Sequence, residues 1–243
     1  MSMPLDRLSA PPWQPKVVSF DCAETLLRTR WDPSQVAVDA LTEAGESLPV
    51  GAYDAYRSLL GKRWAHFQEL NLTGDLAQCD AFWEVLGRNW LAGFGMGEAV
   101  AQRVSEIAWR RIYDPEGDLF QKFPDVVPCL DELRDRGYRM IVLSNWDLSL
   151  TRFLQVHGLS PYFEVIVPSL RYGVEKPSLE LFEIARKAVG SEPGEMLHIG
   201  DHLIDDFQGA RDAGWMTLHL DRGRTESTPP FLHDLCELGG WLC

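Results

Sequence analysis

The stretch VVSFDCAETLL, residues 17–27, joins a short apolar, β-branched run to an aspartate and then to polar residues. This is the pattern of a buried parallel strand that delivers a carboxylate, here Asp21, to the carboxyl edge of a sheet. Open α/β sheets hold their chemistry in the crevice outside those strand ends. Asp21 is therefore the expected centre of a site if later strands also end in polar residues, and only a helix cap if they do not.

Strands and helices alternate in the second half of the chain. After a first strand at 16–20, apolar runs predict strands at 139–143, 163–167, 196–199 and 215–220. The segments between them predict helices at 125–136, about 147–157, 179–189 and 206–213, with a last short helix near 231–238. Such alternation predicts right-handed βαβ units. The expected fold class is α/β, with a Rossmann-like doubly wound parallel sheet as its core.

Residues 32–114 are predicted to be helical throughout. Asp32 and Pro33 have the pattern of an N-cap followed by proline in the first turn, which opens a helix that runs to Gly45. Further helices are expected at about 50–71, 77–91 and 97–112. We therefore expect an all-helical cap at 30–114, inserted into an α/β core formed by 1–29 and 115–243.

Five of the nine tryptophans lie in this helical segment: Trp31, Trp64, Trp83, Trp90 and Trp109. Their default role is to pack a small helical bundle. The alternative is that one or two of them, with Phe67 or His66, line a substrate pocket that faces Asp21.

Composition limits the partners and the compartment. The chain has 243 residues, 45% of them apolar, and a formal charge of −13, which disfavours nucleic acid and anionic membranes as partners. Its five cysteines are scattered without a CxxC pair, as is usual in a reducing compartment. The leader at 1–16 has no apolar core of signal-peptide length, and no apolar run is long enough to span a membrane. We expect a soluble, cytoplasmic protein.

Four predicted strands end in groups that can act together. These groups are Asp21 with Thr25, Ser144 with Asn145, Lys176 in the loop after the third strand, and Gly200 with Asp201, followed by Asp205 and Asp206. Two carboxylates from different strands suit a hard cation such as Mg²⁺. A lysine and a hydroxyl suit a tetrahedral phosphoryl group, and a carboxylate beside them can attack it as a nucleophile.

In this order the groups resemble the motifs of the haloacid dehalogenase (HAD) superfamily of hydrolases. The resemblance covers four segments, at 17–27, 141–147, 173–177 and 198–214. The last segment, which contains HIGD and later DFQGARDAG, is the most specific of them. A helical insertion between the first two motifs resembles the family's first cap type. The pair Glu24-Thr25 is similar to the rhythmically-expressed-gene-2-like subfamily.

The resemblance implies a role for each matching residue. Asp21 would be the nucleophile, Ser144, Asn145 and Lys176 would bind the phosphoryl group, and Lys176 would also restrain Asp21. Magnesium would be held by Asp21, the backbone carbonyl of Ala23 and Asp201, with Asp206 and Asp205 supporting that site from behind. A different reading of Asp206 is an acid at a helix N-terminus, where the helix dipole favours it. The implied partner is a small phosphorylated metabolite, and the implied assembly a monomer or homodimer.

One departure from the family pattern concerns Ala23, which stands where HAD phosphatases usually carry a second aspartate as general acid. General acid catalysis contributes roughly 10²–10⁴-fold, or about 3–5 kcal/mol of barrier. We therefore expect a weak phosphatase, or one limited to good leaving groups such as acyl and aryl phosphates. Glu24 lies one residue out of register and is expected to be a solvated or helix-start acid.

Three other functions fit parts of the pattern. Dehalogenases of the superfamily also lack the second aspartate, but Gly200-Asp201 argues against them because they do not keep this metal-binding pair. Phosphonatases have alanine at the position of Ala23 and use a cap lysine, for which Lys62 is the one candidate in the cap. The third is a HAD fold kept for binding, with vestigial turnover. The Cys-x₅-Arg spacing of Cys22 and Arg28 lacks the glycines of a thiol-phosphatase loop and is taken as coincidence.

Overall fold

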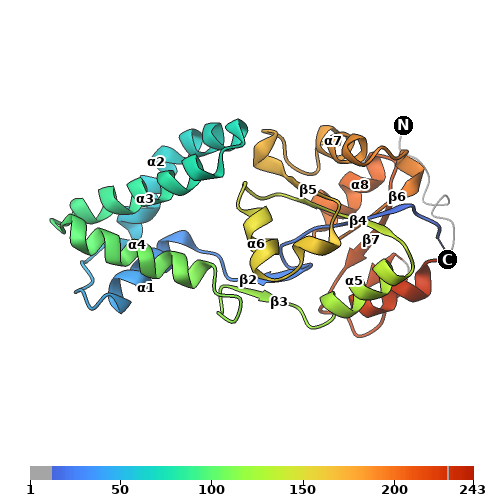
Figure 1. The fold of residues 1–243 in the computed structure, drawn as a ribbon, viewed down its shortest axis with the longest axis horizontal. Coiled ribbons are helices and arrows are strands. Elements are labelled where there is room, and N and C mark those ends of the chain that lie inside the picture. The colour runs from blue at the N-terminus through green and yellow to red at the C-terminus, as the bar shows by residue number, and fades with distance from the viewer. Residues whose placement is uncertain (1–12, 229) are drawn as a thin grey trace. The chain divides into compact units, whose positions relative to one another are not determined.

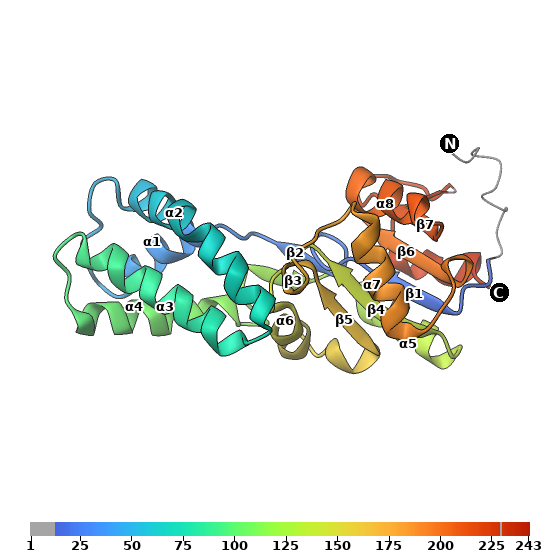
Figure 2. The ribbon, with the colours of Figure 1, turned by 90° about the horizontal axis from the view of Figure 1, so that it is seen from above.

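The computed structural model describes residues 13–228 and 230–243, drawn as ribbons in Figures 1 and 2. The predicted leader falls mostly on residues 1–12, outside the described part of the chain. The chain divides into two compact units. One contains the described residues up to Arg28 together with Lys122–Cys243, and the other is Thr29–Gln121. We call them unit 1 and unit 2 and describe each by itself.

Unit 1 contains a six-stranded sheet in the order β5-β4-β1-β6-β7-β8, in which every pairing is parallel. Its strands are β1 (Val17–Phe20), β4 (Arg139–Ser144), β5 (Val165–Pro168), β6 (Met196–Gly200), β7 (Met216–Leu220) and β8 (Phe231–Leu232). The chain adds strands on one side of β1 and then on the other, which is the doubly wound topology. The predicted α/β class and parallel sheet are confirmed.

Helices cover both faces of this sheet (Figure 1). They are α5 (Val126–Asp135), α6 (Leu150–Val156), α7 (Leu179–Val189) and α8 (Gly209–Asp212). On one face, Leu181 and Phe182 of α7 and Ala210 of α8 pack with Val17 and Ile141 of the central strands in a buried cluster. On unit 1's opposite side, α5 packs against the 3₁₀ helix Leu235–Trp241. The central strands are thus buried on both faces, which explains their continuous apolar runs.

Unit 2 consists of four helices: α1 (Pro33–Glu43), α2 (Ala52–Thr73), α3 (Leu76–Ala92) and α4 (Glu98–Ile112). The predicted N-cap is confirmed, because the Asp32 carboxylate accepts hydrogen bonds from the backbone N–H groups of Ser34 and Gln35. Phe67 is fully buried, with ring centroids 4.9 Å from Phe82 and 5.0 Å from Trp83. Aromatic packing therefore forms the core of this unit.

Two short strands were not predicted from the sequence. β2 (Leu27–Thr29) and β3 (Phe120–Lys122) form a separate two-stranded sheet. The chain passes between the units at 28–29 and at 121–122, so both crossings run through these strands. Three-residue strands are too short to show a periodicity, so they could not be predicted from the sequence.

The structure corrects the C-terminal part of the predicted fold. The helix expected near 231–238 is wrong at its start, because Phe231–Leu232 is strand β8 and helical turns begin only at Leu235. Sheet pairing decides this: the N–H of Asp221 donates to the Leu232 carbonyl at 2.8 Å, and Leu232 is fully buried. The helix expected at 206–213 begins earlier, as a π-helical turn over Leu203–Gln208 that leads into α8. Within 13–228 and 230–243, no helix combines the length and apolarity required to cross a bilayer.

Candidate active site

The predicted site residues of unit 1 lie at the carboxyl ends of the three central strands. Asp21 directly follows β1, and its N–H donates to the Ile199 carbonyl of β6 at 2.9 Å. Ser144 ends β4, and Gly200 ends β6. Because the direction of chain winding reverses at β1, this is the edge where a doubly wound sheet opens a crevice.

Lys176 is the centre of this cluster. Its ammonium Nζ donates to Asp21 Oδ1 at 2.6 Å, to the Leu143 carbonyl at 2.9 Å and to Asp206 Oδ1. The lysine side chain is 2% exposed, and those of Asp21 and Asp206 are 8% and 2% exposed. All three donor positions of the ammonium are therefore used on buried acceptors, which holds the charge in one place.

Asp206 is held from several directions. Its Oδ1 contacts His198 Nε2 at 3.1 Å as well as Lys176, and its Oδ2 accepts the N–H of His202 at 2.9 Å. Gly200 makes this approach possible, since a Cβ there would lie 2.2 Å from the Asp206 carboxyl carbon. The glycine of the fourth motif is thus required by the packing of Asp206.

His198 and Ser19 extend the polar network into the sheet. They are register partners on β6 and β1, and both are fully buried. His198 Nδ1 lies 2.9 Å from the Ser19 hydroxyl. Every polar atom of the pair is satisfied when Nε2–H donates to Asp206 and the Ser19 O–H donates to Nδ1. Burial lowers the pKa of His198 and favours this neutral form.

Three carboxylates, those of Asp21, Asp201 and Asp206, form a group that could hold a metal ion, with one oxygen of each within 4.8 Å of the others. The Thr25 hydroxyl donates to Asp201 Oδ1 at 3.4 Å and orients this carboxylate. The Lys176 ammonium contacts two of these three acids, Asp21 and Asp206, so the group carries excess negative charge. An oxygen-only, negatively charged donor set fits Mg²⁺.

The protonation behaviour of these acids reflects that excess charge. Burial, together with the negative charges of Asp21 and Asp206, raises the pKa of Asp201 to about 7. Burial also raises the pKa of Asp21, against the lowering effect of Lys176. At Asp206 burial is outweighed by Lys176 and His198, so its pKa lies below the usual value. The carboxylates of Asp21 and Asp206 in turn hold the pKa of Lys176 above its usual value despite burial.

Ser144 and Asn145 contact different parts of the cluster. Ser144 ends β4, the neighbour of β1, and against the raising effect of burial its hydroxyl helps to lower the pKa of the Asp21 carboxyl. Asn145 binds the main chain of Lys176 twice: its amide nitrogen donates to the carbonyl at 3.0 Å, and its amide oxygen accepts the N–H at 2.8 Å. Asn145 therefore positions Lys176, and a phosphate contact from Asn145 stays a prediction.

The structure separates the two acids that were expected to support the metal site. Asp206 is 1% exposed and belongs to the carboxylate group. Asp205 is half-buried, and its carboxylate lies 3.3 Å from His202 Nδ1, outside that group. Neighbouring residues on a helical turn point in different directions, so only one of them can face the crevice.

Sequence reasoning missed His198 and Ser19 as members of the site. Both lie inside strands that read as apolar runs, where a polar side chain has to find a buried partner. The presence of two polar residues on strands predicted to be buried on both faces was the sequence feature that could have indicated this pair. Their positions relative to each other came only from the register of β1 and β6.

The residues behind the alternative functions are placed as follows. Lys62 is exposed on α2. Cys22 is fully buried, and burial followed by the charge of Asp21 raises the pKa of its thiol well above the usual value. A thiol-phosphatase nucleophile needs the opposite shift. Ala23 offers no side-chain proton donor, and Glu24 has a positive φ of 52°.

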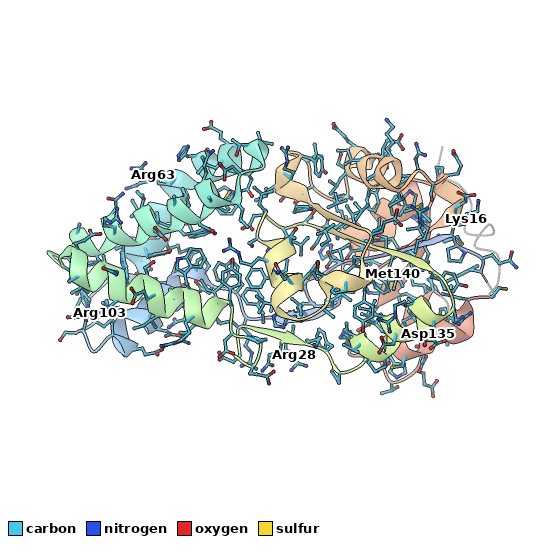
Figure 3. All side chains as sticks on the ribbon, in the orientation of Figure 1. Lys16, Arg28, Arg63, Arg103, Asp135 and Met140 are labelled. Atoms are coloured by element: carbon cyan, nitrogen blue, oxygen red, sulfur yellow. The ribbon has the colours of Figure 1, made fainter. Side chains whose placement is uncertain are left out.

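A pocket in unit 2 lies between α2 and α3, with a volume of about 270 Å³. Its lining includes Arg63 and His66 of α2 with Phe82 and Val85 of α3; Figure 3 labels Arg63 on α2. His66 therefore lines a pocket, whereas Phe67 lies in the core of the unit. Of the five tryptophans in this segment, Trp90 is buried and its indole N–H donates to the Ala52 carbonyl at 2.9 Å.

Comparison with known proteins gives four relevant matches. A family model described as haloacid dehalogenase-like hydrolase matches residues 15–214. The chain is 28% identical over 203 residues to human haloacid dehalogenase-like hydrolase domain-containing protein 3, covering 83% of this chain and 80% of that protein. It is 30% identical over 179 residues to a phosphoserine phosphatase of Thermus thermophilus, covering 73% and 70%. A solved 2-haloacid dehalogenase from Pseudomonas syringae matches with a TM-score of 0.64 over 93% of this chain and 97% of that one, but at 21% identity it informs the fold alone.

Proposed function

The chain belongs to the haloacid dehalogenase-like hydrolases, and we propose that it is a magnesium-dependent phosphatase that works through an aspartyl-phosphate at Asp21. The resemblance expected from the four motifs is confirmed, since the family match extends over residues 15–214. One observation carries the proposal. Asp21, Lys176 and a group of three carboxylates meet at the carboxyl ends of the central strands.

In this proposal the Asp21 carboxylate attacks the phosphorus of a small phosphorylated metabolite. The bond to the leaving oxygen breaks and an aspartyl-phosphate forms; water then hydrolyses it to release phosphate and restore Asp21. The Lys176 ammonium, 2.6 Å from Asp21 Oδ1, keeps the nucleophile in position and offsets the charge of the phosphoryl oxygens. The Ser144 hydroxyl, at the end of β4, would donate to a phosphoryl oxygen.

Asp21, the carbonyl of Ala23 and Asp201 would hold magnesium, with Asp206 behind them. The ion would neutralise charge on the phosphoryl group and on the acids around it. The chain's own contribution is orientation, because Thr25 fixes Asp201 and Lys176 with His198 fixes Asp206. A neutral His198 donates to Asp206 without adding a second buried cation beside Lys176.

Ala23 sets the expected substrate range. The residue at this position has no acidic hydrogen, so a leaving group that needs a proton departs slowly. Aryl and acyl phosphates leave as stable anions and would be hydrolysed best. The name of one relative indicates that it acts on phosphoserine, an alkyl phosphate with a poor leaving group. Under this proposal the present chain would hydrolyse such a substrate slowly, so alkyl phosphates distinguish its activity from that of the relative.

The test is hydrolysis of p-nitrophenyl phosphate with Mg²⁺, comparing wild type with Asp21→Asn. We expect the variant to lose activity by about 10³-fold or more, because it removes the nucleophile and keeps the shape. Asp205→Asn is the matched control, since this acid lies outside the carboxylate group, and it should keep most of the activity. Equal, negligible rates for wild type and Asp21→Asn would remove the enzyme function and leave the HAD fold as a binding protein.

A series of aryl phosphates tests the role of Ala23. We expect kcat/KM to fall steeply as the pKa of the leaving phenol rises. A flat dependence would mean that another group, with Glu24 as the nearest acid in sequence, donates the proton. Glu24→Gln measured over the same series would then restore the steep slope.

A further inference from the structure

Arg222 makes a set of contacts that the proposed chemistry does not use. It follows β7 in the sequence, and all of its contacts described here lie within unit 1. Its Nη2 donates to the Thr25 carbonyl at 2.7 Å, and its Nε donates to the Glu24 carbonyl at 3.3 Å. One guanidinium thus binds two successive carbonyls of the turn that follows the nucleophile strand.

The other side of the guanidinium is fixed as well. Nη1 donates to Asp125 Oδ2 at 2.8 Å, and the same oxygen accepts the N–H of Leu235 at 2.9 Å. The guanidinium carbon lies 3.8 Å from the centre of the Phe123 ring. The guanidinium of Arg28, labelled in Figure 3, lies 5.1 Å from the centre of the same ring. Asp125 and Phe123 therefore hold the plane of Arg222 while its free edge faces the turn.

The turn that Arg222 binds has an uncommon backbone. Glu24 has φ of 52°, and it is the one non-glycine residue with positive φ in the described part of the chain. An L-residue with a Cβ pays for this left-handed conformation, so surrounding contacts have to maintain it. The N–H of Glu24 donates to the Leu27 carbonyl at 2.7 Å, and the carbonyl of Glu24 accepts a hydrogen bond from Arg222.

This conformation governs two groups of the proposed metal site. The peptide between Ala23 and Glu24 is rotated by the φ of Glu24, so that angle orients the Ala23 carbonyl. The carbonyl of Thr25 is bound by Arg222, while its hydroxyl donates to Asp201 at 3.4 Å. A change in the turn would therefore move both a proposed ligand and the residue that orients a second ligand.

We propose that Arg222 is a positioning residue that holds Glu24 in its left-handed conformation and thereby orients the Ala23 carbonyl and Thr25 for the metal site. The effect of Arg222 on magnesium binding rests on the proposed function, whereas its effect on the conformation of the turn does not. Within the described part of the chain, the contacts of Arg222 are with Asp125, Phe123 and two main-chain carbonyls, and not with Asp21, Asp201 or Asp206. It therefore acts on the site through the main chain of Glu24 and Thr25.

The first measurement is hydrogen exchange of the metal-free protein, read at the amides of Glu24, Leu26 and Leu27. Their N–H groups bond to carbonyls within the turn. Arg222→Met keeps the apolar stem and removes the fork; we expect these amides to exchange about tenfold faster. Arg222→Lys keeps the charge but cannot bind two carbonyls and a carboxylate together, so it should show a smaller change in the same direction.

Arg139→Met is the matched control. Arg139 also combines a carboxylate with a main-chain carbonyl, since it binds Glu164 at 2.6 and 2.7 Å and the Val189 carbonyl at 2.8 Å. Arg139 begins β4, at the opposite end of that strand from Ser144. Its loss should affect exchange near Glu164 and leave the turn unchanged. Equal effects of Arg222→Met and Arg139→Met on the amides of Leu26 and Leu27 would overturn the proposal.

The second measurement is Mg²⁺ binding by titration calorimetry. We expect Arg222→Met to weaken binding about tenfold, the lower end of what outer residues of metal sites contribute. A second substitution at Glu24 separates backbone conformation from side-chain effects. Glu24→Gly removes the cost of positive φ, whereas Glu24→Ala removes the carboxylate and keeps the Cβ.

If Arg222 acts through the backbone, Glu24→Gly should recover much of the Mg²⁺ affinity and turn protection lost in Arg222→Met, and Glu24→Ala should recover neither. Equal behaviour of the two double variants would overturn the proposal, as would unchanged exchange in a folded Arg222→Met protein. If wild type binds no Mg²⁺, the metal part of the proposed function fails, and the exchange measurements still decide the role of Arg222 in the turn.

Discussion

The two units of this chain differ in their ion pairs: unit 1 buries some of its pairs, whereas the pairs described in unit 2 are at least partly solvated. In unit 1 the pairs of Lys176 with Asp21 and Asp206 have side chains that are at most 8% exposed. In unit 2 the pair Arg103–Glu46 has side chains that are 50% and 30% exposed; Figure 3 labels Arg103 on α4. A buried charge has a high desolvation cost and persists where it has a task, whereas an exposed pair costs and contributes little. Burial of charge thus distinguishes the unit that carries the chemistry.

The units also differ in what their buried residues do. Unit 2 buries aromatic rings such as Phe67, and its buried Trp90 satisfies its one donor on a neighbouring helix end. Unit 1 buries Lys176, His198 and Asp206 in a connected polar network. Packing explains most of the buried aromatic residues of unit 2, whereas the proposed chemistry explains the buried polar network of unit 1. The substitutions below test this contrast, beginning with the largest expected effect.

Lys176→Met should have the largest effect on stability. It leaves Asp21 and Asp206 buried without their cation, and breaking a buried pair in this way typically costs about 3–5 kcal/mol of unfolding free energy. Urea denaturation in metal-free buffer measures the loss. Lys187→Met, which removes an exposed ammonium from α7, is the control and should change the midpoint little. Similar losses from both substitutions would contradict the contrast.

Magnesium should stabilise the protein through the carboxylate group of unit 1. A ligand that binds only the folded state adds about 2.7 kcal/mol at a concentration 100 times its Kd. Urea denaturation with and without Mg²⁺ should show this gain in wild type. Asp201→Asn removes one proposed ligand and should abolish most of it, whereas Asp80→Asn on α3 should leave it unchanged. A full gain in Asp201→Asn would mean that the ion binds elsewhere.

Gly200→Ala and Gly61→Ala should change stability in opposite directions. A Cβ at Gly200 would lie 2.2 Å from the Asp206 carboxyl carbon, so we expect a loss of about 1–3 kcal/mol from overpacking. A Cβ at Gly61, inside α2, meets nothing within 4 Å, so alanine should add about 0.5–1 kcal/mol. Thermal unfolding of both variants checks the signs. A stable Gly200→Ala protein would mean that Asp206 can move without cost.

Arg111→Met should have the smallest effect. Arg111 of α4 pairs with Asp39 at 3.1 Å and with Glu43 at 3.7 Å, and all three side chains are partly solvated. Removing such a pair typically costs about 0.2–1 kcal/mol, and the loss should shrink in high salt because solvated charges are screened. Urea midpoints at low and high salt measure both. A loss comparable to that of Lys176→Met would show that unit 2 also depends on its charges.

Much of the site could be predicted from the sequence, because the end of a buried strand is visible as an apolar run followed by polar residues. Asp21, Lys176 and Asp201 each follow an apolar run or its loop, and parallel strands bring their ends to one edge. The sequence pattern does not show how Asp205 and Asp206 differ in burial, because the π-helical turn that contains them determines which acid faces inward. His198 lay hidden within a strand, and only the sheet register shows that Ser19 is its partner.

Fold features outside the main alternation were less accessible. The helices of unit 2 have caps and lengths that the sequence displays, such as the Asp32 cap of α1. β8 has two residues, too few to show a period, and it exists because its backbone pairs with β7. The role we propose for Arg222 had no sequence signal, because its partners come from two segments, at 24–25 and 123–125, that lie far from it in the chain.

The central place of β1 in the sheet has a consequence for how the chain is made. Among the described strands, β1 pairs with β4 and β6, so it has no sheet partner until residues 139–144 have followed it. Unit 2 is continuous in sequence and can form its helices during that interval. Contacts such as that of Thr25 with Asp201, 176 residues apart, can form only after most of the chain has been made. We therefore expect slow, non-local completion of unit 1, with Asp21 exposed to solvent until the sheet partners of β1 have formed.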